Sequence, residues 1–292
     1  MLDKMLIRST LHFTHTRIIG RRYLSIGKEH IPTITLFQYA ICPFCNINKA
    51  LLGYTGTPYN ITEVNPLTKA ELKFSTDGYK KVPIATISNE PSDSGLTQIN
   101  GSEEINQALL SVPSVIKGLS EKNKLSIDIF QNSPSAKQWQ TFAKDELAPI
   151  IYPNICSSLP ESYQAFGYVD HVREFTGMQK IMIKGLGSLA MYFAASKIKQ
   201  KRNITDEREA LRNALKTWKE DGLDNGAKDY GSGSNSPDLG DLAMFGVIHS
   251  VKGLNAHDEM ILGKGDGHDV DPVVLEWYLR MEEQVVGNKD AK

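Results

Sequence analysis

Cysteine is scarce in this chain, with three residues among 292. Two of them, Cys42 and Cys45, share a single CxxC motif, and the third is Cys156. Three cysteines cannot build a disulfide framework, which indicates a reducing compartment where thiols serve chemistry rather than structure. We interpret Cys156 as a small buried apolar side chain. Zinc needs four ligands, and because the chain has no second CxxC motif and no His-x-His pair, we expect no metal site.

The chain also lacks an excess of charge of either sign and any long apolar run. Its formal net charge is −1, which gives no general electrostatic reason to bind nucleic acid. No stretch approaches the roughly 18 to 20 uninterrupted apolar residues that cross a bilayer, so we expect any membrane contact to be peripheral. A composition with 40% apolar residues is sufficient for two globular domains, each with its own core.

The first thirty residues predict a targeting arm rather than part of the fold. This segment contains several arginines, serines and threonines, and Asp3 is the only acid in residues 1–27. Such a composition is typical of mitochondrial presequences. We therefore expect residues 1–30 to be a disordered arm that directs the protein to the mitochondrion. The alternatives are a basic arm without a targeting role and a location in the cytoplasm or at the periphery of a Golgi or other internal membrane.

Residues 31–110 show alternating strand and helix patterns. Strands are indicated by β-branched and apolar runs, and helices by apolar residues at helical spacing. We expect strands at 33–39, 59–64, 82–87 and 96–100 and helices at 43–54, 66–74 and 102–110. The resulting order β-α-β-α-β-β-α predicts an α/β domain of the thioredoxin or glutaredoxin type.

The remainder of the chain predicts an all-α bundle after a linker. Ser-rich turns with Pro113 and Pro134 indicate a linker at 111–134, followed by a helical domain at 135–288. Asp238 and Asp241 have the spacing of a capping box, a structural role. We expect helices at 139–151, 166–175, 180–201, 206–221, 238–254 and 272–286.

The CxxC motif lies between the first predicted strand and the following helix. This position places Cys42 at the helix amino terminus, where unpaired N–H groups and the helix dipole favour a thiolate. We therefore expect the sulfur of Cys42 to be exposed and acidic. Cys45, one turn into the helix, is placed to resolve a mixed disulfide.

Two further motifs complete a candidate groove for glutathione. Val82-Pro83, about forty residues after the cysteines and just ahead of a strand, stands where thioredoxin-like proteins place a cis proline. A cis bond there turns the backbone of Val82 toward the cysteine, where it can pair with an extended peptide. Ser102 begins a predicted helix, and a helix start can bind an anion such as the γ-glutamyl carboxylate.

Short motifs shared with one known family continue along both predicted domains. They include Phe37-Gln38-Tyr39-Ala40-Ile41-Cys42-Pro43-Phe44-Cys45, Glu63-Val64-Asn65-Pro66, Lys80-Lys81-Val82-Pro83-Ile84, Asp238-Leu239-Gly240-Asp241 and Trp277-Tyr278-Leu279-Arg280. In these motifs the chain resembles the prostaglandin E synthase 2 family, from about residue 33 to 282. The resemblance implies a glutathione-S-transferase-like fold that dimerises, with a glutaredoxin-like amino-terminal domain.

The resemblance also implies an activity and the residues that carry it. The activity is a thiol-stimulated isomerisation of the lipid endoperoxide prostaglandin H2 to prostaglandin E2. Cys42 is implied as the catalytic thiol and Tyr39 as its hydrogen-bonding partner. Val82 and Pro83 are implied to hold the glutathione backbone, and Ser102 its γ-glutamyl carboxylate.

Haem is implied as a further ligand beside glutathione. In the family, a histidine in the first helix after the linker holds it, and this sequence has Pro149 there. Two other functions remain open at this stage. One is a glutaredoxin-like thiol-disulfide oxidoreductase, in which Cys45 takes part in catalysis. The other is a non-enzymatic protein that binds glutathione or haem.

Overall fold

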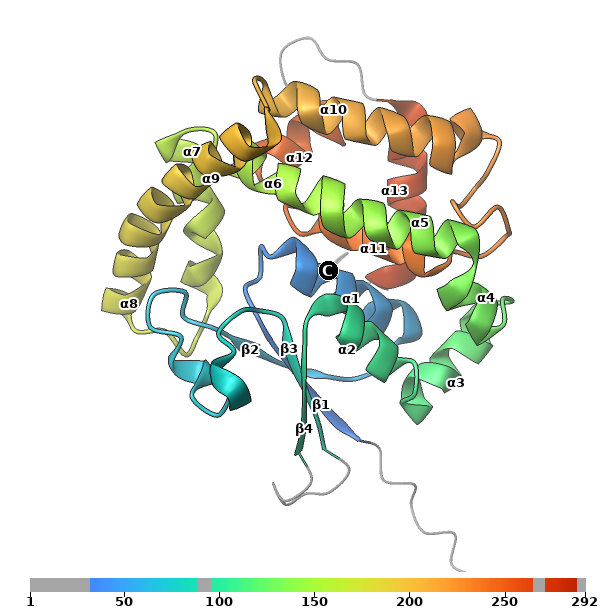
Figure 1. Ribbon diagram of the computed structural model, residues 1–292, viewed down its shortest axis with the longest axis horizontal. Coiled ribbons are helices and arrows are strands. Elements are labelled where there is room, and N and C mark those ends of the chain that lie inside the picture. The colour runs from blue at the N-terminus through green and yellow to red at the C-terminus, as the bar shows by residue number, and fades with distance from the viewer. Residues whose placement is uncertain (1–31, 89–95, 265–270, 288–292) are drawn as a thin grey trace, which may run out of the picture. The chain divides into compact units, whose positions relative to one another are not determined.

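The computed structural model describes residues 32–88, 96–264 and 271–287. A four-stranded sheet has the order β2-β1-β3-β4 (Figure 1). β1 is parallel to β2, whereas β3 is antiparallel to both of its neighbours, β1 and β4. The strands are β1 (Thr33–Gln38), β2 (Asn60–Glu63), β3 (Ile84–Ser88) and β4 (Leu96–Asn100). The predicted targeting arm, residues 1–30, lies outside the described residues.

Two helices of this α/β part agree with the predictions. They are α1 (Pro43–Thr55) and α2 (Ser102–Leu109). The helix predicted at 66–74 is wrong, since this segment contains only one short 3-10 turn, η1 (Ala70–Leu72). A second such turn, η2 (Thr76–Gly78), follows it. The reason is local: the side chain of Asn65 accepts the N–H groups of Leu67 and Thr68, and Lys69 has a left-handed backbone with φ of 51°. An asparagine that pairs with the following N–H groups favours a turn over a helix.

The segment 111–134, predicted as a linker, contains two helices. They are α3 (Pro113–Lys122) and α4 (Ile127–Asn132). α3 packs on α1, because Val115 and Leu119 are buried and Gly118 lies directly against the backbone of Thr55. This segment therefore belongs to the core.

The carboxy-terminal part is helical, as predicted. One continuous helix runs through α5 (Pro134–Phe142), the π-turn η4 (Ala143–Leu147) and α6 (Ala148–Ile155). Another runs through α8 (Gly177–Met182), the π-turn η6 (Ile183–Gly187) and α9 (Ser188–Arg202). The others are α7 (Leu159–Ala165), α10 (Glu207–Thr217) with η7 (Trp218–Gly222), α11 (Leu239–His249), α12 (Asn255–Met260) and α13 (Pro272–Val285).

The helix predicted at 166–175 is also wrong. The α-helix, α7, lies before this segment. It begins after Ser158, whose hydroxyl accepts the N–H of Glu161, and ends at Ala165. Residues Phe166–His171 form the 3-10 segment η5. The cap at Ser158 thus starts the helix earlier than apolar spacing alone indicates.

Helix α11 joins the α/β part to the helical part. It lies beside α1 and α5 (Figure 1) and packs on both. Most of its residues are buried. Its start is the predicted capping box, in which Asp238 accepts the N–H of Asp241 at 3.1 Å and Asp241 accepts the N–H of Asp238 at 3.0 Å. Asp241 also accepts the indole N–H of Trp277 at 3.1 Å. These bonds satisfy the buried carboxylate of Asp241 and one oxygen of the buried carboxylate of Asp238, whereas Oδ2 of Asp238 has no hydrogen-bond partner among the described residues. They fix the start of α11 in the core.

Candidate active site

The loop between β1 and α1 is held from both sides. The N–H of Ala40 donates to Oε1 of Glu63 at 2.7 Å, and the side chain of Gln38 donates to the other carboxylate oxygen at 3.0 Å. On the other side, Nδ2 of Asn46 donates to the carbonyl oxygens of Ala40 and Cys42 at 2.8 and 2.9 Å. These four bonds fix the loop that carries Cys42.

Cys42 is the N-cap of α1, as predicted from the spacing of the motif. The pKa of its thiol lies below the ordinary value, chiefly because the thiol of Cys45 donates a hydrogen bond to its sulfur. The backbone N–H groups of Phe44 and Cys45 donate as well. The prediction of an exposed sulfur is wrong, since Cys42 is only 4% exposed, and the lowered pKa is reached against the effect of burial.

Cys45 differs from Cys42 in its protonation. It is fully buried, and burial raises the pKa of its thiol well above the ordinary value. Both cysteines are free thiols. Of the pair, Cys42 is therefore the nucleophile. Cys45 stays protonated, and its thiol donates a hydrogen bond to the sulfur of Cys42.

A tyrosine that the sequence analysis missed completes the surroundings of Cys42. The hydroxyl of Tyr152, on α6, donates to the sulfur of Cys42 and helps to lower its pKa. Tyr39, the partner implied by the family resemblance, lines the same cavity, and burial raises its pKa to about 12. No hydrogen bond from the Tyr39 hydroxyl to Cys42 is present among the described residues. Spacing in the sequence gives no signal for Tyr152, because it lies 110 positions away from Cys42 on another part of the fold.

Cys42 lies at the wall of a largely apolar cavity of about 240 Å³. The cavity is formed between the α/β part and the helices α6 and α9 with η5 and η6. Its lining contains three tyrosines, Tyr39, Tyr152 and Tyr168, and the second thiol Cys156. The others are Ile41, Pro66, Leu67, Lys69, Ile155, Phe166, Gly187, Ala190 and Met191. An apolar wall with a few convergent polar groups is typical of a site for a small apolar ligand.

Two charged side chains lie behind the cysteines. Burial raises the pKa of Glu63, which holds the loop, to about 7. Lys49 follows Cys45 by one turn of α1, so the two side chains share a face of the helix. Burial lowers the pKa of the Lys49 amine, while the cysteines and Glu63 favour its charged form. Lys49 therefore offers positive potential near the thiol pair.

The two predicted binding motifs lie next to each other. The bond between Val82 and Pro83 is cis, as predicted. The carbonyl oxygen of Pro83 accepts the N–H of Gly101 at 3.1 Å, and the carbonyl oxygen of Ser102 accepts a hydrogen bond from Asn48 of α1 at 2.7 Å. The cis proline, the start of α2 and the helix that carries Cys42 are thus directly connected.

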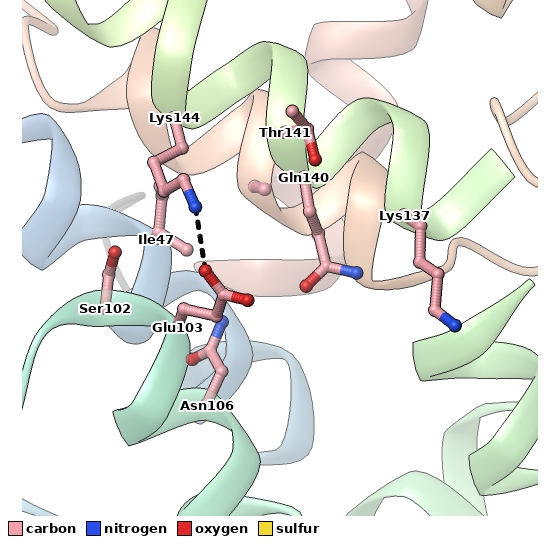
Figure 2. A pocket seen from close by; sticks show the side chains of 9 residues that line it. Ile47, Ser102, Glu103, Asn106, Lys137, Gln140, Thr141 and Lys144 are labelled. Atoms are coloured by element: carbon pink, nitrogen blue, oxygen red, sulfur yellow. Dashed lines mark hydrogen bonds and ion pairs between the residues drawn. The ribbon is translucent and has the colours of Figure 1, made fainter. Parts of the chain in front are cut away.

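Ser102 also lines a second, more polar cavity of about 300 Å³, which lies between α2 and the helix formed by α5 and η4. Figure 2 shows the ion pair that crosses it, from Lys144 to Glu103 at 2.8 Å. Cys42 does not belong to this lining. Cys42 and Tyr39 therefore line one cavity and Ser102 another.

The residues around Cys42 do not fit a haem held by histidine. None of the residues that line the cavity of Cys42 is a histidine. Pro149, where the resemblance places that ligand, lies in α6 and has no donor atom.

No family profile matches the chain. Prostaglandin E synthase 2 from Danio rerio is 30% identical over 283 residues, which cover 85% of this chain and 70% of the relative. The chain belongs to the prostaglandin E synthase 2 family.

Solved structures with a similar fold confirm the predicted fold class. A glutathione S-transferase from Sinorhizobium meliloti has a TM-score of 0.52 at 16% identity and covers 86% of this chain and 88% of its own. Ure2p, solved in complex with glutathione, has a TM-score of 0.51 at 18% identity and covers 88% and 92%. The fold is a thioredoxin-like α/β part followed by a helical part of the glutathione S-transferase type.

Proposed function

We propose that the chain is a glutathione- and thiol-dependent isomerase that converts prostaglandin H2 to prostaglandin E2 through Cys42. The observation that carries this proposal is a Cys42 thiol of lowered pKa at the wall of an apolar cavity with three tyrosines. The name of the Danio rerio relative, prostaglandin E synthase 2, supports the substrate. The glutathione bound in Ure2p supports the co-substrate.

The proposed reaction begins at the weak O–O bond of the endoperoxide. The thiolate of Cys42 attacks the oxygen on the carbon that becomes the ketone, so an S–O bond forms and the O–O bond breaks. The other oxygen leaves as an alkoxide and takes a proton. Tyr152 is placed to supply it, because burial raises the pKa of Tyr152 and keeps its hydroxyl protonated at neutral pH.

The second half of the reaction regenerates the thiolate. The Tyr152 phenolate left by the first half takes a proton from the same carbon, the C=O bond forms, and the S–O electron pair returns to sulfur. The substrate is oxidised at one carbon and reduced at the O–O bond, so the step needs no external oxidant. Glutathione supplies a reducing thiol that returns an oxidised Cys42 to its active form.

Glutathione would lie along the cis proline and the start of α2. We propose that the backbone of Val82 and Pro83 holds its peptide and that Ser102 holds its γ-glutamyl carboxylate. The hydrogen bond between Pro83 and Gly101 supports this, because it keeps the two elements adjacent.

The deciding experiment measures prostaglandin E2 formed from prostaglandin H2 above the non-enzymatic rate, with glutathione present. It compares the wild type with Cys42→Ser and Cys45→Ser. We expect Cys42→Ser to lose the activity and Cys45→Ser to retain most of it. A wild type that forms no prostaglandin E2 above the background rate would refute the isomerase.

A glutaredoxin-like oxidoreductase is the second candidate, favoured by the hydrogen bond between the two thiols. In that case the two thiols together reduce a mixed disulfide of glutathione, and Cys45→Ser abolishes this activity. An unaffected Cys45→Ser variant argues against it. A third candidate is a non-enzymatic protein that binds glutathione or haem. High turnover of prostaglandin H2 or of a mixed disulfide of glutathione would exclude it.

We also propose that the protein is a homodimer in the mitochondrion. The basic composition of residues 1–30 supports the location. A fusion of these thirty residues to a fluorescent protein tests it, and a cytoplasmic or Golgi signal would favour the alternatives. Sedimentation of the full chain tests the dimer.

A further inference from the structure

Helices α8, η6 and α9 form one continuous helix, Gly177–Arg202, which we call the outer helix. Figure 1 shows it beside α7 at one edge of the described fold. Its outward face carries six large apolar side chains, each between 43% and 69% exposed. Their spacing of mostly three or four residues places them on one side of the helix. They are Met178, Ile181, Met182, Leu186, Leu189 and Phe193.

The opposite face of the outer helix is bound to the fold. Ile183, Gly187 and Ser188 are buried there. The carbonyl oxygen of Ser188 accepts the hydroxyl of Ser162 on α7 at 2.6 Å. Gly187 lies so close to Phe166 that an added Cβ would come within 2.9 Å of its ring.

The outer helix is also the one helix of the described residues that is long and apolar enough to cross a membrane. Its 18-residue apolar window has a mean hydropathy of 1.2, yet only 22% of that window is buried. Because α9 packs on α6 and α7 and η6 packs on η5, the helix is held on the fold. It can therefore lie in the plane of a membrane surface more readily than span the bilayer.

The charge of the outer helix indicates what covers its apolar face. It contains six lysines and arginines and no acidic residue. Lys184, Lys199 and Arg202 pair with acids of neighbouring elements. Lys197 and Lys201 are exposed and make no ion pair within the described part of the chain. A matching surface is therefore both apolar and negatively charged.

An anionic lipid surface has both properties, because acyl chains lie just beneath acidic headgroups. A second copy fits less well. A two-fold contact that pairs this face with itself would give Lys197 and Lys201 no partner of opposite charge, because the outer helix contains no acidic residue. Charge complementarity therefore favours lipid over self-association.

We propose that the outward face of the outer helix is the surface by which the protein docks on anionic lipid membranes. Gly187, Ala190 and Met191 of the same helix line the cavity of Cys42. Docking thus brings the helix that forms one wall of this cavity to the lipid surface. The proposal names the surface of a peripheral membrane contact and stands independently of the isomerase, because its test needs no catalysis.

The test measures binding of the full chain to sedimented vesicles of phosphatidylcholine with about 30% phosphatidylserine, compared with phosphatidylcholine alone. The variants are Ile181→Glu and Leu186→Glu, and the matched control is Ile129→Glu on α4. Ile129 is 50% exposed and lies away from the outer helix. All variants keep the basic arm, so its contribution is equal in each.

We expect the wild type and Ile129→Glu to bind anionic vesicles alike, and each outer-helix variant to bind at least about tenfold more weakly. Lys197→Glu should weaken binding to anionic vesicles and leave binding to neutral ones unchanged. Circular dichroism spectra like those of the wild type show that the variants are folded. Equal binding of Ile181→Glu and Ile129→Glu would overturn the proposal.

A second measurement does not depend on lost binding. In Phe193→Trp, vesicles with brominated acyl chains should quench the new tryptophan, whereas Leu279→Trp on α13 should not be quenched. Absence of quenching at position 193 would contradict docking through this face. A second result would also contradict the proposal: a wild-type dimer that binds no vesicles and dissociates to monomers in Ile181→Glu. The outward face would then be the contact with a second copy.

Discussion

Removing the hydroxyl of Tyr152 tests the electrostatics of the site most directly. In Tyr152→Phe the ring is kept, and only the hydrogen bond to the sulfur of Cys42 is lost. A hydrogen bond to a charged group contributes roughly 1.5 to 3 kcal/mol. The Tyr152 hydroxyl contributes least among the donors to this sulfur, so its loss should raise the pKa of Cys42 by an amount at the lower end of that range.

The assay is the pH dependence of alkylation of Cys42 by iodoacetamide, followed at that residue by mass spectrometry. Only the thiolate reacts, so the midpoint of the rate profile reports the pKa. At a pH below both midpoints, the variant should react roughly ten times more slowly than the wild type.

Tyr39→Phe is the matched control for this prediction. Tyr39 lines the same cavity but makes no described hydrogen bond to Cys42 through its hydroxyl. Its variant should therefore leave the midpoint nearly unchanged. A shift in Tyr39→Phe as large as that in Tyr152→Phe would refute the assignment and restore Tyr39 as the partner of the thiolate.

Three further predictions concern stability, each measured by urea unfolding. The pKa of Glu63 is raised from 4.5 to about 7, so the folded state holds this proton more tightly and Glu63 lowers the stability as pH rises from about 5 to 7. Glu63→Gln should remove about 2 kcal/mol of that pH-dependent loss, and an unchanged pH dependence would contradict the raised pKa. Asp241→Ala should cost about 3 kcal/mol or more, because it leaves buried donors at Gly231 and Trp277 unpaired, whereas Asp128→Ala on the exposed side of α4 should cost less than about 1 kcal/mol. Gly246→Ala should cost about 1 to 3 kcal/mol, because the added Cβ meets the carbonyl oxygen of Asn46 at 2.6 Å, while Gly185→Ala, which meets nothing within 4 Å, should be neutral or slightly stabilising.

Local sequence patterns predicted the parts of the site that lie within a short stretch of chain. The strand, Cys42 and the helix start follow one another directly, so the N-cap position of Cys42 follows from spacing. The capping box of Asp238 and Asp241 is local in the same way. The prediction of a helix at 66–74 was wrong because apolar spacing was not the deciding factor there. The side chain of Asn65 pairs with the N–H groups that follow it and favours a turn.

The parts that were missed depend on contacts between distant segments. Tyr152 reaches Cys42 because α6 crosses the end of the α/β part, and the same crossing buries the sulfur that the motif alone indicated as exposed. Apolar spacing in residues 180–201 correctly predicted a helix. It did not show that one apolar side of that helix, around Ile181 and Leu186, faces away from the core. Periodicity indicates that a face is apolar, but only the fold decides what lies against it.

The site and the core share α1, which links the stability of the fold to the chemistry of Cys42. Cys42 begins this helix, and α11 supports the same helix through the close contact at Gly246. α11 also packs on α5, which continues into the helix that carries Tyr152. A shift between α1 and α11 should therefore lengthen the hydrogen bond from the Tyr152 hydroxyl to the sulfur. In the alkylation assay, Gly246→Ala should raise the pKa of Cys42 in the same direction as Tyr152→Phe, while Gly185→Ala leaves it unchanged. An unshifted Gly246→Ala would mean that the loop held by Glu63 and Asn46 positions the thiol without support from α11.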